Sequence, residues 1–242
     1  MRQRFPHIVR LFLVCLTSFT SLLFAQVQHS YYGEIQLRNF GYDAGFYQKS
    51  VGFNKKTQKE VGIQLGSLVH PKEVYVLNTG LPGSRIFKID KINYAWVLKP
   101  RISYRYPLAK RSSRFEIGVS LFGGFQLPLA YSWPVYVFLY DGNVPFDGYA
   151  DVRYDPDVHE PKSIGGNASF SRGIKDGKFT PGIGSHAGVS LEWGNYRNFS
   201  NELSFGLTAD YFVKEIPIMH SNNVNLQFYP AVFLKFAVGY MP

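Results

Sequence analysis

Three residues of catalytic types stand close together in the sequence, at His186, Ser190 and Glu192. A nucleophilic serine, a histidine base and a carboxylate are the groups of a hydrolytic triad. The surrounding residues alternate between apolar and polar, which predicts a strand, and on a strand residues i and i+4 lie about 13 Å apart. These three residues alone therefore cannot form a triad, and we predict no catalytic site in this chain.

A second group of chemically capable residues is the acidic stretch 147–160, which contains Asp147, Asp151, Asp155, Asp157, His159 and Glu160. Oxygen ligands at this density suit Ca²⁺. The spacing differs from the twelve-residue calcium loop, because no glycine follows the third acid and Pro156 interrupts the stretch. We expect a solvated acidic loop without metal or cofactor, and a calcium site is the alternative.

Most other charged residues occupy every second position of segments whose remaining positions are aliphatic or aromatic. In 94–106, Lys99, Arg101 and Arg105 face one way and the large apolar residues face the other. Period-two alternation with an aromatic-rich apolar face is typical of membrane β-barrels. A soluble β-sandwich also alternates, but aromatic residues near strand ends, an alternating last strand with Phe236 and Tyr240, and alternating short and long connections favour the barrel.

The elements that would position these residues are eight antiparallel strands. We predict an all-β fold, a closed transmembrane barrel with strands at 31–39, 41–50, 58–68, 91–107, 114–131, 180–192, 200–213 and 226–240. The break near Phe40-Gly41 is very short, so residues 31–50 form either one strand or two. No segment after the first 25 residues has 18 uninterrupted apolar residues, so we expect β rather than helical spans.

With the polar faces turned inward, seven acids and five bases meet in the lumen: Glu34, Arg38, Asp43, Glu60, Lys99, Arg101, Arg105, Glu116, Glu192, Glu202, Asp210 and Lys235. An eight-stranded barrel is narrow enough for side chains to fill. Because an unpaired buried charge is costly, we predict a network of ion pairs rather than a wide pore.

The first 25 residues have the pattern of a secretory signal peptide. Arg2, Arg4 and Arg10 precede an apolar run that ends before Ala25-Gln26, and this run is short for a membrane anchor. We expect residues 1–25 to be removed and residues 26–242 to form one barrel domain. The formal net charge is +9; an exported chain of this kind suits anionic lipid and lipopolysaccharide headgroups, and we expect no nucleic-acid partner.

One predicted external connection is unusually apolar. It contains Trp133, Tyr136, Phe138 and Tyr140 and is followed by Tyr154 and Asp155 in the acidic stretch. Such a run extends the preceding strand, caps the barrel mouth or offers an aromatic surface to another protein. We take these six residues as the candidate partner-binding site.

Four short motifs resemble an uncharacterised family of Bacteroidota outer-membrane β-barrels. They are Phe24-Ala25-Gln26, Arg153-Tyr154-Asp155-Pro156, Gly194-Asn195-Tyr196 and the segment 214–219. The resemblance implies a location in the outer membrane and membership of a larger envelope complex, such as secretion or outer-membrane protein assembly machinery. We therefore expect a non-enzymatic accessory or structural barrel with an envelope protein partner. The alternatives are a small porin-like transport or ligand-binding barrel and a lipid-modifying outer-membrane enzyme.

Overall fold

The computed structural model describes residues 29–51, 57–81, 83–109, 116–140, 149–196, 198–220 and 225–240. The predicted signal peptide lies outside the described residues. Long strands form the body of the molecule: β1 (His29–Arg38), β2 (Gly41–Val51), β3 (Gln58–Ser67), β6 (Asn93–Ala109), β7 (Gly118–Gln126), β8 (Leu129–Pro134), β12 (Lys178–Tyr196), β13 (Phe199–Phe212) and β14 (Phe228–Tyr240).

These strands close into an antiparallel barrel of eight positions. The order is β13-β14-β1-β2-β3-β6-β7-β12, and β12 pairs again with β13 to complete the ring. The first and last strands pair from Tyr31 with Tyr240 to Arg38 with Phe233. The predicted fold class is therefore confirmed, and closure leaves no long strand edge in the bilayer.

β7 and β8 together occupy one position in the ring. Both lie between β6 and β12, and the break falls at Leu127-Pro128, because proline has no N–H to donate to a strand ladder. Backbone bonds from Leu127 N to Pro100 O and from Gly182 N to Pro128 O hold the wall together at the break. The strand predicted at 114–131 thus extends to Pro134, and residues 110–115 lie outside the described part of the chain.

Residues 31–50 form two strands joined at Asn39-Phe40. Gly41 has φ +130°, and a Cβ added there would lie 2.3 Å from Ser67 O. Only glycine fits this tight reversal without strain, which explains why so short a break turns the chain.

The two faces of the barrel wall differ in polarity as the alternation predicts. Along β14 the burial alternates without exception, with Phe228, Val232 and Phe236 among the exposed side chains. Tyr31, Tyr104, Tyr106, Phe199 and Tyr240 form an aromatic band near the end with short connections, and Tyr42, Tyr211 and Phe228 lie toward the other end. An apolar outer band between aromatic girdles is the surface that a bilayer covers.

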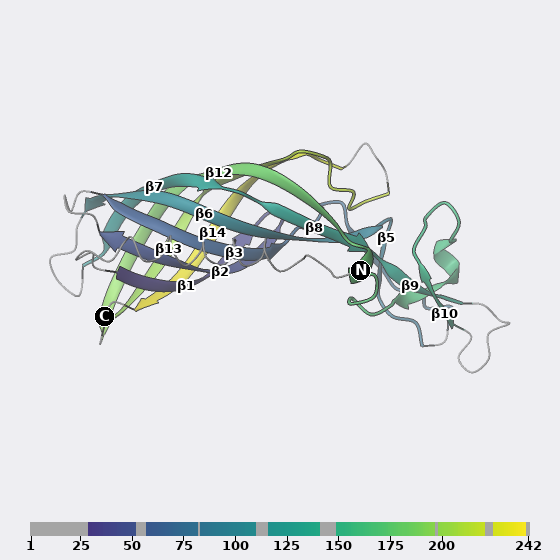
Figure 1. The fold of residues 1–242 in the computed structure, drawn as a ribbon. Coiled ribbons are helices and arrows are strands. Elements are labelled where there is room, and N and C mark those ends of the chain that lie inside the picture. The colour runs from purple at the N-terminus through teal and green to yellow at the C-terminus, as the bar shows by residue number, and fades with distance from the viewer. Residues whose placement is uncertain are drawn as a thin grey trace, which may run out of the picture.

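The long connections form a head beyond one end of the barrel (Figure 1). Its elements are β4 (Val74–Val76), β5 (Phe87–Ile89), β9 (Tyr136–Tyr140), β10 (Tyr149–Arg153), η1 (Pro161–Ser163) and β11 (Ile164–Asn167). β10-β9-β11 is a three-stranded sheet, and β4 pairs with β5. The sequence predicts long connections here and does not show their short strands, because strands of three to five residues are too short to show a clear period. The alternative that the apolar run extends the preceding strand is confirmed, since β9 follows β8 almost directly. Long loops are external in such barrels, so the head is external.

The head has its own apolar core of Phe87, Val135, Val137, Tyr154 and Ile164. It continues directly from the wall, since only Val135 separates β8 from β9. Among the described residues, no helix is long and apolar enough to cross a bilayer.

Candidate functional site

The barrel lumen holds a dense network of buried ion pairs. In the described residues it contains six acids and six bases: Glu34, Asp43, Glu60, Glu192, Glu202, Asp210, Arg38, Lys49, Lys99, Arg101, Arg105 and Lys235. They come from β1, β2, β3, β6, β12, β13 and β14, because the strand period of two turns alternate residues to the same interior. The six negative and six positive charges of this network are therefore equal in number.

Glu202 on β13 is the centre of the network. Its carboxylate accepts from Arg105 Nη2 at 2.7 Å and from Lys49 Nζ at 3.2 Å, and it lies 3.4 Å from Lys235 Nζ. The Tyr47 hydroxyl donates to it at 3.1 Å. Its side chain is fully buried, so four donors from β2, β6 and β14 compensate for the lost hydration of this carboxylate.

From this centre the network spreads across the lumen. Arg105 also binds Glu60 at 2.6 Å and donates to the Ser190 hydroxyl. Lys235 lies 3.5 Å from Glu34, whose carboxylate binds Arg101 at 2.5 Å. The central ion pairs therefore form one connected group.

A second group of ion pairs lies toward the head. Arg38 binds Asp43 through two nitrogens, at 2.5 and 2.8 Å. Lys99 lies 3.0 Å from Asp210 and 3.8 Å from Asp43. Gln126 donates to Asp210 at 2.5 Å, so polar side chains span the lumen at this level as well.

Aromatic rings fill the space between the charges. Tyr32 and Tyr47 stack at 4.8 Å, with Lys49 4.3 Å from the Tyr32 ring. Lys235 lies between Tyr47 and Phe122, at 4.8 and 5.1 Å from their ring centroids. Aromatic faces attract cations most strongly where water is excluded. These three rings and Lys49 were not among the residues predicted for the lumen. The available signal was their place in the strand alternation, since Tyr32 lies on the same face of β1 as Glu34.

One predicted lumen residue is elsewhere. Glu116 is exposed and precedes β7, which begins only at Gly118, so it lies outside the buried lumen. The prediction failed because the alternation was extended past the real start of the strand. Glu192 does lie among the charged groups, with its side chain 21% exposed.

His186, Ser190 and Glu192 have separate partners. His186 Nε2 lies 2.7 Å from Ser103 Oγ, Ser190 accepts from Arg105, and Glu192 accepts from Ser200 at 3.0 Å and lies 3.3 Å from Lys49. All three face the interior of one regular strand, β12. They do not form a triad with one another, as their spacing predicted.

The external mouth of the barrel is closed by an apolar lid. Ile216, Ile218 and Met219, from the connection between β13 and β14, are buried against inward side chains at the ends of the strands: Leu68, Ala95, Val97, Ala130, Phe212 and Tyr229. Asn225 fixes the lid segment 216–219, because its amide accepts from Ile218 N and Met219 N and donates to Met219 O at 2.9 to 3.0 Å. The lid covers the ion pairs on the side of the head.

The six candidate partner-binding residues all lie at the head, but in different environments. Trp133 and Tyr154 are each 4% exposed, which corrects the expectation that they contact a partner directly. Tyr136 and Phe138 are half-buried, and Tyr140 and Asp155 are exposed. The first two residues thus support the head, whereas the others contribute to its surface.

The acidic stretch is held by local contacts. Asp151 binds Arg172 at 2.9 Å, and Asp157 lies 3.1 Å from His220. Asp155 accepts from Asp157 N. Asp147 lies outside the described residues, and within the described ones no three carboxylate or histidine side chains converge as metal ligands.

A buried charge cluster lies within the connection between β3 and β6. Glu73 accepts from Lys88 and, at 2.5 Å, from Lys91. Burial lowers the pKa of Lys91 to about 8, against the opposing effect of Glu73. Burial alone would raise the pKa of Glu73, but the hydrogen bonds from Lys88 and Lys91 outweigh it and hold this pKa below its ordinary value.

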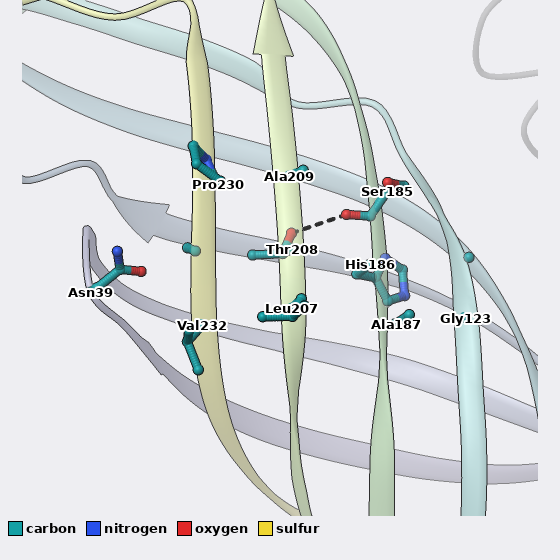
Figure 2. A pocket seen from close by; sticks show the side chains of 12 residues that line it. Asn39, Gly123, Ser185, His186, Ala187, Leu207, Thr208, Ala209, Pro230 and Val232 are labelled. Atoms are coloured by element: carbon teal, nitrogen blue, oxygen red, sulfur yellow. Dashed lines mark hydrogen bonds between the residues drawn. The ribbon is translucent and has the colours of Figure 1, made fainter.

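The outer wall has a shallow groove across β7, β12, β13 and β14 (Figure 2). Its volume is about 580 Å³, and small residues such as Gly123, Ala187 and Ala209 stand where larger lipid-facing side chains would fill it. Thr208 donates to Ser185 O at 3.3 Å beside it. The groove lies on the face of the wall that the acyl chains of the bilayer cover.

Comparison with solved structures supports the architecture. A major outer membrane protein from Thermus thermophilus matches with a TM-score of 0.50 and 11% identity over 89% of this chain and 99% of that chain. Neisserial surface protein A matches with a TM-score of 0.37 and 11% identity, over 89% of this chain and 96% of the other. The N-terminal β-barrel domain of Pseudomonas aeruginosa OprF matches with a TM-score of 0.35 and 10% identity, over 89% and 98%.

No protein-family model and no curated protein sequence matches the chain. The Thermus structure shares the fold at low identity, and the closed wall, apolar belt and aromatic girdles give the physical reason for a bilayer setting. The chain is an eight-stranded antiparallel β-barrel of the outer membrane.

Proposed function

We propose that this protein is a non-enzymatic, non-conducting barrel that acts as a structural or accessory subunit of an envelope complex, with the head as its docking element. One observation carries this proposal: the lumen is occupied by ion pairs and covered by the lid, whereas the head has its own core and continues from the wall through β8 and β9. A blocked barrel is poorly suited to transport but is a firm support for an external domain.

The β4–β5 hairpin offers the most suitable contact surface on the head. Val76 and Phe87 pack into the head core, so their neighbours on the opposite face point away from it. Tyr75, Leu77 and Ile86 are 65%, 50% and 58% exposed there. Grouped exposed apolar side chains of this kind often mark protein contacts. Tyr140 and Asp155 add exposed surface elsewhere on the head.

The proposed partner is another envelope protein. The resemblance to Bacteroidota outer-membrane barrels supports secretion or outer-membrane protein assembly machinery as the complex concerned. A partner that covers Tyr75, Leu77 and Ile86 would remove this apolar surface from water, which favours association.

The test is purification in a mild detergent of the native protein and of a variant with Tyr75→Ser, Leu77→Ser and Ile86→Ser together. These changes leave Val76 and Phe87 in the core, so the head should still fold. We expect the native protein to bring down a stoichiometric envelope protein and the variant to lose it. Val213→Ser, which alters a side chain 64% exposed at the end of β13, is the matched control and should retain the partner. Recovery of a lone barrel from native membranes contradicts the proposal.

A further inference from the structure

A second groove lies on the outer wall at the base of the head. Its volume is about 380 Å³, and only aliphatic and aromatic residues line it: Leu65, Trp96, Leu98, Leu129, Tyr131, Trp133, Phe170, Ile174 and Phe179. The ring centroids of Tyr131 and Phe179 lie 4.5 Å apart with the rings tilted by 39°, and Trp133 meets Phe170 edge-on at 5.0 Å. We call it the aromatic groove.

One side of the aromatic groove is built by residues 168–177, which we call the strap. The strap includes the short helix η2 (Ile174–Asp176) and is attached to β8 by two side chains. Trp133 Nε1 donates to Phe170 O at 3.1 Å, and the Tyr131 hydroxyl donates to Ile174 O. Gly173 has φ +79°, and a Cβ there would lie 2.9 Å from Pro134 O. The strap is therefore held closely against the wall by specific contacts.

The position of the aromatic groove indicates an acyl chain as its occupant. Leu65, Leu98 and Phe179 are outward residues of the barrel and remain 46%, 37% and 67% exposed. Leu65, Trp96 and Leu98 also line a larger apolar groove of about 640 Å³, which continues over β3, β2, β1 and β14. The apolar surface thus runs without interruption from the head into the lipid-facing wall.

The charges of the strap indicate the headgroup. Arg172 and Lys175 flank Ile174 in the sequence, and both are exposed. The Arg172 side chain is 59% exposed and forms its ion pair with Asp151; Asp176 is the acidic residue within the strap. Basic side chains at a bilayer surface attract anionic headgroups, and arginine binds phosphate oxygens well. The external leaflet of an outer membrane consists mainly of phosphorylated glycolipid.

We propose that the aromatic groove binds one acyl chain of this phosphorylated outer-leaflet glycolipid, with Arg172 and Lys175 at its phosphate. Phe179 and Ile174 contact the chain, and Trp133 and Tyr131 position the strap. Asp151 competes with the phosphate for Arg172. The site is separate from the hairpin surface proposed to bind a protein.

Binding is tested with the full barrel in phosphatidylethanolamine nanodiscs that contain lipid A as the probe, with bound lipid A counted by native mass spectrometry. We expect one tightly bound lipid A for each native barrel. Arg172→Gln with Lys175→Gln should weaken binding about thirtyfold, which corresponds to about 2 kcal/mol. Lys72→Gln with Lys162→Gln, which neutralises two exposed head lysines, is the charge control and should bind normally.

The acyl-chain contact is tested by a matched pair of variants. Phe179→Ala should weaken binding roughly tenfold, whereas Phe125→Ala, at a lipid-facing ring 72% exposed on β7, should not. Asp151→Asn should tighten binding, because it frees Arg172. Equal binding by the native protein and the Arg172/Lys175 variant overturns the proposal. Equal affinity for phosphatidylglycerol or for dephosphorylated lipid A overturns the assigned headgroup.

Discussion

At the scale of single residues, the lumen shows how buried charges are compensated inside a membrane protein. Glu202 has three cations and the hydroxyls of Tyr47 and Ser204 as partners. Two ions cost several kcal/mol to remove from water, and this cost is compensated only when geometry and hydrogen bonding are good. The network therefore stabilises the barrel as a unit, and loss of one member leaves its partners uncompensated.

Glu202→Gln should strongly destabilise the barrel. It leaves Arg105, Lys49 and Lys235 with one fewer anion in the lumen, so we expect the free energy of unfolding to fall by about 3–5 kcal/mol. Urea unfolding in detergent, followed by tryptophan fluorescence and by gel mobility, measures this change. Glu215→Gln, at an exposed position, should change it by less than about 0.5 kcal/mol. Equal effects of the two substitutions would refute the central role of Glu202.

Because of Lys91, the stability at the base of the head should vary with pH in the alkaline range. Its pKa is about 8 in the folded protein and about 10.4 in an unfolded chain. Between these values the unfolded state binds more protons, so the free energy of unfolding contributed by this site rises with pH. Comparison with Lys91→Met isolates the effect, because the other groups titrate in both proteins. From pH 8 to 10, the free energy of unfolding of the native protein should rise relative to that of Lys91→Met by on the order of 2 kcal/mol. A difference between the two proteins that does not change with pH contradicts the lowered pKa of Lys91.

Residue types, together with their even or odd positions along each strand, were sufficient to predict most of the charged residues of the lumen. Glu116 lies outside the lumen. The other charged residues expected there form ion pairs and lie on strands whose alternation is regular, such as β6 and β13. Tyr32, Tyr47 and Phe122 were missed because an aromatic residue fits either the lipid or the space between buried cations. Only the positions of the cations on neighbouring strands distinguish these settings.

At the scale of elements, two connecting segments, the lid and the strap, are held against the barrel by specific contacts. The lid lies over the lumen from the connection after β13, and the strap lies against the outside of β8. The sequence did not predict either, because each depends on contacts between residues far apart in the chain. Period two revealed the long strands, but β4, β5, β9, β10 and β11 are too short for it.

Asn225→Ala should loosen the lid without unfolding the barrel. The asparagine amide makes three bonds to the backbone of Ile218 and Met219. Its loss removes the acceptor of Met219 N, whereas Ile218 N still donates to Ile216 O at 2.9 Å. Hydrogen exchange at the Met219 amide should accelerate by about tenfold or more, whereas exchange in β13 should change little. Asn39→Ala, in the exposed β1–β2 turn, is the control. Unchanged protection at Met219 would show that the Asn225 amide does not hold the lid.

At the scale of the whole molecule, the barrel and the head differ in the surfaces they present. The wall meets lipid through its apolar belt, and the lumen side chains neutralise and fill one another. The head is joined to the wall through β8 and β9 and presents the hairpin face of Tyr75, Leu77 and Ile86. In the proposed function the closed barrel supports the external surface, and the barrel shape by itself does not indicate transport.

The most direct test of this account is the conductance of the purified full-length barrel in a planar lipid bilayer. A lumen filled by the Glu202 and Asp43 ion pairs and covered by the lid predicts no stable channels above the leak of the bare bilayer. Glu202→Gln should remain silent wherever the barrel still folds, because one lost charge does not remove the surrounding side chains. Stable ohmic channels in the native protein, with a selectivity that changes in Arg101→Gln, would contradict the account.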